Sequence, residues 1–589
     1  MSIKKNIKEI EKKLNKGNIN ESLVSLLESI DIYPNNVQLR NLLGNLYFKL
    51  GDLEKGLSQF NYSLSINFDK NLAEFILDIC LKEKKWSQAR ISLDLLIASS
   101  KRFDLFLIKA RVLREQGLIN DAKNIYADLL EKGCKDLSLF ISYGYTLNRQ
   151  GLFTEAVKIY NQGLSIHKED PDLHFNIGIT YGNLKEYDKA INYLGKESNK
   201  QKPISQLLTL ANFQHKIRNF DAAEITINEA YEREPENPLV IFQKATLKMQ
   251  SGNNREALKL LQQALTKKPN DNEINYHIGI IKLRLGQIQE SIKYYDYRML
   301  REKDKLDAEY LIAPDKLNVN DELLVMHEQG IGDQILATRV LSKLSEKVNK
   351  IMYLSTEKLY PYLKRNLKNI EVLNEVNFLK KNYPNHSLKI NLLSCLKYIN
   401  NPVEISRGMD NYRIDDLIKN EYLKKYKNDK KKIVGLSWFS KNEKIGDEKS
   451  YPLEIIKSLN ISTSKFISLQ YGDVKKDINK LKHENTIEII NDDELDYYND
   501  IDKLSCLVSI CDIVITCSNV TAHIAGSLGI KTFLVLPKLY GKIWYWYQND
   551  DKYVWYPSVK IIEQDVDNDW QSCIQKINQL LKDWAIKKY

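Results

Sequence analysis

The sequence predicts a two-part protein, in which a helical repeat solenoid precedes an α/β region built from two Rossmann-like lobes. Three observations support this fold class. The chain has 589 residues, more than one hydrophobic core normally supports. Small residues recur at a near-constant spacing through the first half, whereas short β-branched runs separated by helical segments fill the second. With 43% apolar and 28% charged residues, most of the chain is expected to fold.

In the first half, small residues recur in two phases with a step of about 34 residues, the tetratricopeptide period. A missing side chain in each of two antiparallel helices lets the helices pack closely. Eight full repeats are predicted between residues 37 and 300, after a partial one that closes at Pro34. Such a solenoid presents a concave face that suits an extended peptide or a partner protein. The two phases are Gly44, Ala110, Gly144, Gly178, Ala211, Ala245 and Gly279, and Gly56, Ala89, Ala122, Ala156, Ala190, Ala223, Ala257 and Ser291.

Beyond Arg301 the pattern changes to buried strands that alternate with helices, which predicts doubly wound parallel sheets. A basic run, residues 419–432, separates the strands into two groups, and we interpret it as a solvated connector. The predicted strands are 322–327, 350–355, 432–438, 465–470, 512–517 and 531–537. The predicted domains are a repeat solenoid (1–300), a linker (301–320), an N-terminal lobe (321–405), an interlobe linker (406–430) and a C-terminal lobe with a terminal helix (431–589).

Composition narrows the possible partners and the compartment. The net charge of +10 comes from 87 basic and 77 acidic residues that are mixed along the chain, so no nucleic-acid partner is expected. No signal peptide or transmembrane segment is predicted, because no apolar run is long enough. The seven scattered cysteines lack paired spacing, which indicates reduced thiols. We therefore expect a cytoplasmic protein.

The first candidate turn is the segment HEQGIGD, residues 327–333, which follows a strand and opens a helix. Its glycines allow a tight turn with exposed amides, which suits an anion or a sugar. Asp333 at the start of the helix either accepts a proton as general base or caps the helix, and the spacing favours neither interpretation. His327 and Glu328 are the alternative bases.

The second candidate turn is CSNVTAHIAG, residues 517–526, between a strand and a helix. Ser518 and Asn519 are good N-caps, and capping alone explains either of them. It does not explain the polar Thr521 and His523 in an otherwise apolar segment. The first amides of the helix with these side chains are expected to hold a diphosphate.

The chain resembles bacterial tetratricopeptide-repeat glycosyltransferases that are related to the heptosyltransferase family. The resemblance covers nearly the whole chain and implies a GT-B fold, a nucleotide-sugar donor held mainly by the C-terminal lobe, and an acceptor in the interlobe cleft. It also implies no obligatory metal and no cofactor beyond the sugar-nucleotide substrate. After the repeats, the segments that carry it are HEQGIGDQIL, VGLSWFSKNEK, KSYPLEII, FISLQYGD, CSNVTAHIAGSLGIKTFLVLP and WYPSVKIIEQ, in the family's order.

The resemblance also assigns roles to single residues. Asp333 matches the acid that serves as general base, and Ser518 stands where many relatives have an acid. The predicted acceptor or sugar side consists of His327, Gln329, Gly330 and Gly332. The predicted donor side consists of Lys441, Lys449, Gln470, Ser518, Asn519, Thr521 and His523.

The expected function is transfer of a sugar from a nucleotide sugar to a protein or glycan acceptor that the repeats recruit. Amides and a cation would stabilise the departing diphosphate without a metal ion. A base on the opposite lobe implies inversion at the anomeric carbon. The alternative is a non-catalytic adaptor with a degenerate nucleotide-binding region, which Ser518 favours. A nucleotide-sugar epimerase is a further rival, but a small-molecule enzyme gains little from a peptide groove.

Overall fold

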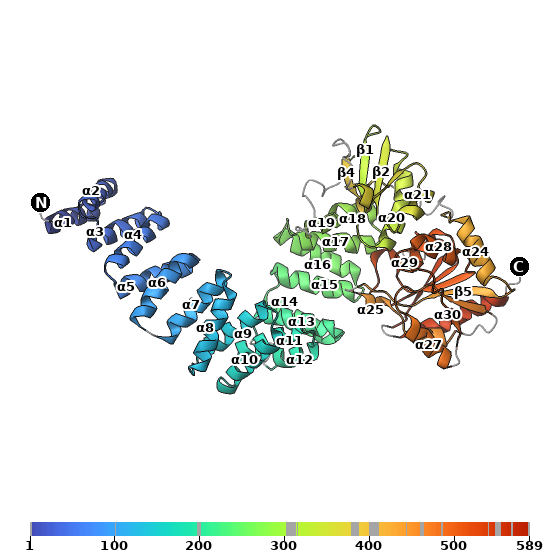
Figure 1. The fold of residues 1–589 in the computed structure, drawn as a ribbon, viewed down its shortest axis with the longest axis horizontal. Coiled ribbons are helices and arrows are strands. Elements are labelled where there is room, and N and C mark those ends of the chain that lie inside the picture. The colour runs from blue at the N-terminus through green and yellow to red at the C-terminus, as the bar shows by residue number, and fades with distance from the viewer. Residues whose placement is uncertain are drawn as a thin grey trace. The chain divides into compact units, whose positions relative to one another are not determined.

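The computed structural model describes residues 3–100, 102–196, 202–301, 314, 316–378, 388–399, 412–442, 445–459, 464–484, 487–539, 541–547, 555–566 and 569–586. The chain forms two compact units, Met1–Glu229 and Ala230–Tyr589 (Figure 1). The division falls within the helical array, so the last hairpins belong to the same unit as the sheets. Among the described helices, none is long and apolar enough to cross a bilayer.

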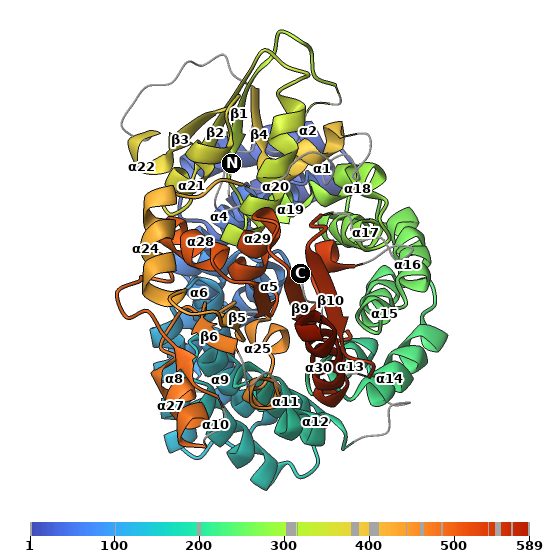
Figure 2. The ribbon, with the colours of Figure 1, turned by 90° about the vertical axis from the view of Figure 1, so that its right-hand side faces the viewer.

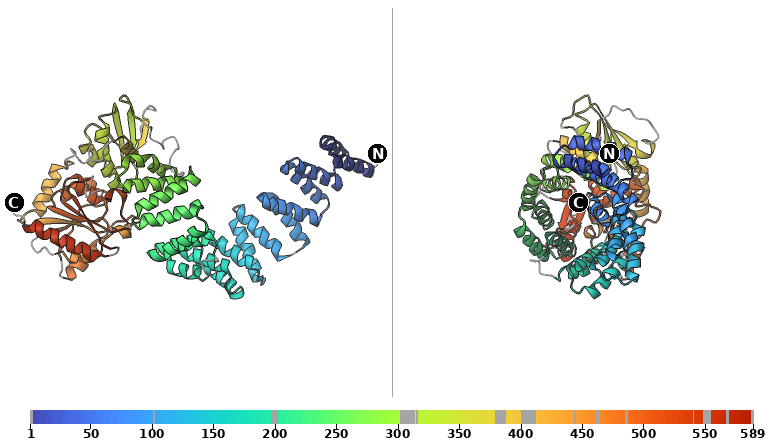
Figure 3. Two further views of the ribbon diagram at one scale, coloured as in Figure 1. Left: turned by 180° about the vertical axis from the view of Figure 1, so that it is seen from behind. Right: turned by 90° about the vertical axis from the view of Figure 1, so that its left-hand side faces the viewer.

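The first part of the chain is a series of helical hairpins, which stack one after another within Met1–Glu229 (Figure 3). The predicted eight repeats are confirmed, and the segment before residue 37 forms a hairpin of its own. The pairs are α1 Ile3–Asn15 and α2 Ile19–Ile32, α3 Val37–Lys49 and α4 Leu53–Ile66, α5 Lys70–Lys82 and α6 Trp86–Ser99, α7 Phe103–Glu115 and α8 Ile119–Glu131, α9 Leu137–Arg149 and α10 Phe153–Ile166, α11 Pro171–Asn183 and α12 Tyr187–Leu194, α13 Ile204–Lys216 and α14 Phe220–Arg233, α15 Pro238–Gln250 and α16 Asn254–Lys267, and α17 Asn272–Arg284 and α18 Ile288–Tyr295.

The periodic small residues mark the places where paired helices touch. A Cβ on Gly44 of α3 would lie 2.7 Å from the ring of Phe60 on α4. Similarly, a Cβ on Gly279 of α17 would lie 2.5 Å from the backbone nitrogen of Tyr295 on α18. Phe60 and Tyr295 are both buried. At Gly44 the large Phe60 side chain therefore occupies the space that the glycine leaves, and at Gly279 the missing side chain lets the backbone of the partner helix come close, as the spacing predicts.

Two parallel sheets follow the hairpins, and every strand pairing in them is parallel. All six predicted strands are present, and four more strands were not predicted: β3, β4, β7 and β10. The first sheet has the order β3-β2-β1-β4 and the second the order β10-β9-β8-β5-β6-β7. Their bounds are β1 Glu322–Met326, β2 Lys350–Ser355, β3 Glu371–Asn374, β4 Leu388–Asn391, β5 Lys432–Ser437, β6 Ser464–Ser468, β7 Ile489–Ile490, β8 Ile513–Thr516, β9 Thr532–Leu536 and β10 Val559–Glu563.

The strand orders identify where a ligand is expected. In the first sheet, β2 and β3 lie on one side of β1, and β4 lies on the other side of β1. In the second sheet, β6 and β7 lie on one side of β5, and β8, β9 and β10 lie on the other side. Ligands of such sheets bind outside the carboxyl ends of the strands where the strand order reverses. The turns after β1, β5 and β8 lie at those ends. The two turns that the sequence singled out therefore lie at the topological switch points.

Short and long helices connect these strands and cover the sheets (Figures 1 and 2). The predicted interlobe linker contains α24, and the basic run 419–432 is not simply the solvated connector that we expected. Its first part lies in α24, which buries Tyr422 and Tyr426, and its last residue begins β5. The helices are α19 Arg298–Arg301, α20 Ile331–Leu344, α21 Tyr360–Asn366, α22 Glu375–Phe378, η2 Leu392–Tyr398, α24 Asp416–Tyr426, α25 Gly446–Lys449, α26 Leu453–Lys457, α27 Lys475–His483, α28 Ile501–Ser509, α29 Val520–Ser527, η3 Trp544–Trp546 and α30 Trp570–Ile586.

The last hairpin, α17 and α18, shares a hydrophobic core with both sheets. Leu283, Ile288 and Ile292 belong to one buried cluster together with residues of β1, α20 and α29. Tyr295 meets Trp544 of η3 edge to face, with ring centroids 6.4 Å apart. The end of the repeat array is thus packed onto the α/β region.

The close packing of the repeats predicts that Gly44→Ala destabilises the protein. Alanine raises helix propensity by up to about 1 kcal/mol over glycine, but the new methyl group would overlap the buried Phe60 ring. We expect a net loss of about 1–3 kcal/mol in the unfolding transition of the unit Met1–Glu229, measured by a urea titration followed by circular dichroism. The neighbouring exposed residue provides the control, because Asn45→Ala changes propensity without overpacking. Equal stability of the two variants would contradict this packing.

Candidate functional site

A cavity of about 260 Å³ opens between the carboxyl ends of the two sheets. Both predicted turns contribute to its wall. The predicted residues that line it are Gly330, Gly332 and Asp333 from the first turn, Lys441 and Lys449 from the segments after β5, and Ser518, Asn519 and His523 from the second turn. Residues predicted from two segments almost 200 residues apart therefore line one cavity.

The two turns approach each other closely at the floor of this site. A Cβ on Gly332 would lie 2.5 Å from Cδ2 of His523, so only glycine fits there without displacement. The helices that follow the turns, α20 and α29, pack against each other. The contact between the Gly332 backbone and the His523 ring therefore sets the distance between the two turns.

Asp333 lies in the first turn of α20, is partly exposed, and lines the cavity. Its Oδ2 accepts a hydrogen bond from the backbone N–H of Gly330 at 3.2 Å, and the Tyr545 hydroxyl also donates to the carboxylate. Burial raises the pKa of Asp333, while the Lys449 charge and these two hydrogen bonds oppose the rise. The carboxyl group thus caps the helix and at the same time faces the cavity, so the two interpretations of this residue are compatible.

Positive charge exceeds negative charge around the cavity. Three lysines, Lys358, Lys441 and Lys449, line it together with one carboxylate, Asp333. Lys449 is 6% exposed, and its burial lowers the pKa of its ammonium group, whereas the charge of Asp333 raises it. A buried cation with one nearby carboxylate and two further lysines favours an anionic ligand.

Asn519 holds the second turn in shape. Its Oδ1 accepts from the Thr521 backbone N–H at 3.0 Å, and its Nδ2 donates to Ser437 Oγ at 2.8 Å and to the Phe439 carbonyl at 3.2 Å. The cap of α29 is thereby fastened to the end of β5. Ser518 Oγ accepts a hydrogen bond from Trp546 Nε1 at 2.8 Å. The Ser518 hydroxyl therefore accepts from an indole donor.

His523 is a neutral imidazole in a shell of aromatic rings. Burial, with a further contribution from the Lys449 charge, lowers the pKa of His523 to about 3. Its Nδ1 lies 3.1 Å from the Tyr556 hydroxyl, and its ring lies 5.2 Å from Tyr545 and 5.0 Å from Trp546 between centroids. A Tyr556 hydroxyl that donates to Nδ1 leaves the proton on Nε2, which then serves as a donor.

Four predicted residues do not line the cavity but lie in or beside the turns. Gln470 is fully buried, and its Oε1 accepts from the backbone N–H groups of Trp438 and Phe439 at 2.8 and 2.9 Å. Thr521 Oγ1 donates to the Leu469 carbonyl at 3.3 Å. The other two belong to the first turn: His327 contacts the Glu375 carboxylate at 2.7 Å, and Gln329 has φ +62°. The ligand contacts predicted for these four residues stay predictions.

Sequence reasoning missed one side of the cavity. Lys358 after β2 contributes to it, and its Nζ lies 3.6 Å from the centroid of the Tyr498 ring. Tyr471, Tyr497 and Tyr498 line the same side. Tyr471 directly follows Gln470 in a segment that the sequence did single out, but Tyr497 and Tyr498 lie in a polar loop without periodicity. Neither a motif nor a periodic pattern in the sequence identifies Tyr497 and Tyr498 as residues of the cavity.

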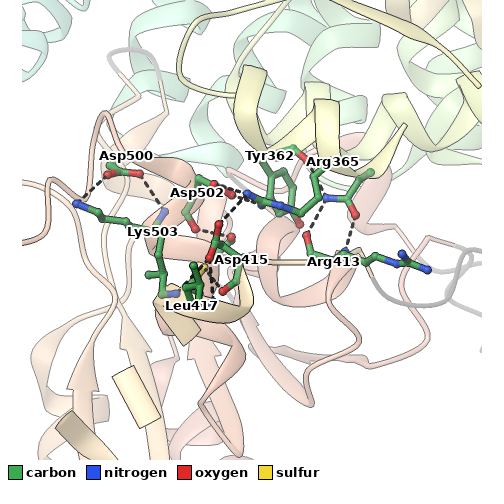
Figure 4. A network of polar contacts seen from close by, with 12 residues as sticks. Tyr362, Arg365, Arg413, Asp415, Leu417, Asp500, Asp502 and Lys503 are labelled. Carbon is green, nitrogen blue, oxygen red and sulfur yellow. Dashed lines mark hydrogen bonds and ion pairs between the residues drawn. The ribbon is translucent and has the colours of Figure 1, made fainter. Parts of the chain in front are cut away.

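A polar network joins the segments beside the cavity (Figure 4). Arg365 of α21 makes two hydrogen bonds to Asp502 of α28, at 2.5 and 2.8 Å, and lies 3.7 Å from Asp415, the N-cap of α24. Tyr362 and Ser527 share a buried hydrogen bond of 2.7 Å. The Asp502 carboxylate is therefore bound by the guanidinium group of Arg365. Within the described part of the chain, no three His, Cys, Asp or Glu side chains gather as a metal site.

Comparisons with known proteins identify the helical array. Residues 171–196 and 242–304 match tetratricopeptide repeat families. A 120-residue stretch is 31% identical to Protein FlbA of Caulobacter vibrioides, and it spans 20% of this chain and 20% of that protein. The chain therefore aligns with about a fifth of that relative's length.

Two tetratricopeptide repeat proteins are among the solved structures that are similar to part of this chain. One, from Parabacteroides merdae, is 17% identical, covers 40% of this chain and 94% of its own, and has a TM-score of 0.35. Another, the C-terminal part of a repeat protein from Cytophaga hutchinsonii, is 16% identical, covers 41% and 92%, and has a TM-score of 0.30. The two family matches and the stacked hairpins show that the chain contains a tetratricopeptide-repeat solenoid, which is followed by parallel sheets compatible with an α/β region.

The buried imidazole predicts a pH dependence of stability. The unfolded chain protonates His523 below its ordinary pKa of 6.5, whereas the folded protein keeps it neutral down to about pH 3. Stability therefore falls as the pH falls through this window, by about 1.4 kcal/mol per pH unit. Between pH 7 and pH 5, denaturant titrations should show the wild type losing about 2 kcal/mol more than His523→Gln. Equal losses would show that His523 is not buried as a neutral ring.

Proposed function

We propose that this protein is a glycosyltransferase that moves a sugar from a nucleotide sugar to a protein or glycan acceptor recruited by the repeats. The two sheets with their helices would be the lobes of a GT-B fold, with the acceptor on the first lobe and the donor on the second. The observation that carries the proposal is the pairing of Asp333, on the first turn, with Lys449 and His523 across one cavity.

The donor diphosphate is proposed to lie against the second turn. The Lys449 ammonium group and the Nε2–H of neutral His523 supply a positive charge and a donor where the leaving group becomes negative, beside the start of α29, where Val520 lines the cavity. The next two amides of α29, those of Thr521 and Ala522, are already bonded to Asn519. Lys441 and Lys358 add positive charge at the rim. Because these groups are fixed before the substrate arrives, they need no reorganisation as the bond breaks, and no metal ion is required by this proposal.

Asp333 is proposed to act as the general base. Its carboxylate takes the proton of the acceptor hydroxyl while the oxygen attacks the anomeric carbon and the bond to the diphosphate breaks. Attack from the first lobe, opposite the leaving group, gives inversion at that carbon. The raised pKa of Asp333 suits this role, because a base works best when its pKa approaches the working pH.

A non-catalytic adaptor is the second candidate. The tetratricopeptide repeats favour a protein-binding role by themselves, and Ser518, which accepts a hydrogen bond from Trp546, stands in place of the acid of many glycosyltransferases. An adaptor would bind its partner without turning over any nucleotide sugar.

Asp333→Asn separates the two candidates. The amide cannot accept the acceptor proton, so transfer should fall by ~10²- to 10⁴-fold. The measurement is the release of nucleoside diphosphate from a panel of nucleotide sugars, with and without acceptor. Asp447→Asn is the matched control, since Asp447 is exposed. Turnover by Asp333→Asn at the rate of this control would remove Asp333 from the mechanism, and a wild type without any turnover would favour the adaptor.

The hydrogen bond from Tyr545 predicts a change in the pH–rate profile. Burial raises the pKa of Asp333 and the Tyr545 hydroxyl opposes that rise, so Tyr545→Phe should raise the pKa further. The base must be ionised, and the acid limb of kcat/KM should therefore move to higher pH in the variant. A control variant, Tyr498→Phe, lines the cavity elsewhere and should keep the wild-type limb. An unchanged limb in Tyr545→Phe would contradict the contact.

A further inference from the structure

The last hairpin of the repeat array makes a buried ionic contact with the turn that carries Asp333. Arg298 begins α19, directly after α18, and its Nε and Nη2 donate to the two carboxylate oxygens of Glu328 at 2.8 and 2.6 Å. The Arg298 and Glu328 side chains are 4% and 8% exposed. A bidentate contact of this kind fixes both the distance and the orientation of the carboxylate.

Three further groups complete the cluster. Arg298 Nη1 donates to Asp296 Oδ1 at 2.7 Å, and Ser394 Oγ donates to the same oxygen at 2.6 Å. The backbone N–H of Leu393 donates to Glu328 Oε1 at 2.8 Å. Asp296 caps the end of α18, and Ser394 lies in η2 after β4. The cluster therefore joins the hairpin, the turn after β1 and the segment after β4.

The turn held in this way contains a backbone conformation that needs support. Gln329 has φ +62°, which L side chains rarely adopt and which costs free energy. Its neighbours are anchored on both sides. Glu328 is held by Arg298, and the backbone N–H of Gly330 donates to Asp333 at 3.2 Å. Strained residues persist only where their surroundings determine their conformation.

We infer that Arg298 is a positioning residue for the proposed base, so that the last repeat completes the acceptor side of the site. Through Glu328 it holds Gln329 in the left-handed region and orients the start of α20, where Asp333 lies. The inference rests on the proposed function of Asp333. It also gives Glu328 a role other than base, because three donors occupy its two oxygens.

A hydrogen–deuterium exchange experiment on the full chain tests this inference without requiring turnover. Arg298→Lys keeps the charge but loses the bidentate geometry. Exchange of the amides in 327–334 should become ~10-fold faster, while 517–524 in the donor turn stays unchanged. Arg255→Lys on α16, where Arg255 is exposed, is the matched control and should leave both segments unchanged.

Unchanged exchange in 327–334, or an equal increase in every part of the chain, would overturn the inference. Should Arg298→Lys not fold, Ser394→Ala removes one hydroxyl of the same cluster and should give a smaller increase confined to 327–334. No increase in that variant would also overturn it.

Kinetics separate this inference from the proposed function. In Arg298→Lys, kcat should fall while binding of UDP, GDP and ADP, measured by calorimetry, stays at the wild-type level, because the donor turn is untouched. A loss of nucleotide binding equal to the loss in kcat would overturn the positioning role. If Asp333→Asn keeps full turnover, the proposed base is wrong, and the exchange result still decides whether Arg298 orders the turn.

Discussion

The contact between Gly332 and His523 is the constraint on which the candidate site depends. It brings the start of α20 and the start of α29 to a separation that no side chain larger than hydrogen at position 332 allows without displacement. Because each helix begins at the carboxyl end of a central strand, this single contact aligns the switch points of two separate sheets. Asp333 and Lys449 face the same cavity as a result.

This geometry also places a buried lysine and a partly exposed aspartate in one cavity. Burial lowers the pKa of Lys449 and raises the pKa of Asp333, while each charge favours the ionised form of the other. The binding of an anion, or a change in the protonation of either group, should therefore change the pKa of the other. Aromatic rings around His523 exclude water from one wall and keep its imidazole neutral.

Much of the fold was predictable from the sequence because its signals are local and repeated. The regular spacing of Gly44 and the later small residues predicted the helical hairpins, and the apolar runs predicted six of the strands. Short strands such as β7 lack a run long enough to detect. The site was only partly predictable. Turn motifs indicated Asp333 and His523. Lys358 and Tyr498 are far apart in the sequence and come together only in the folded chain. The contact between Arg298 and Glu328 joins regions that were predicted to be separate domains.

We propose above all that the cavity between the two turns binds a sugar nucleotide through its diphosphate. Isothermal titration calorimetry of the intact chain with a panel of nucleotide sugars tests it most directly. We expect at least one of them to bind saturably at one site per chain. Binding should weaken in Lys449→Met and at higher salt, because the buried cation and the surplus positive charge of the cavity contribute to affinity. Absence of binding across the whole panel, or equal affinity in Lys449→Met, would contradict it.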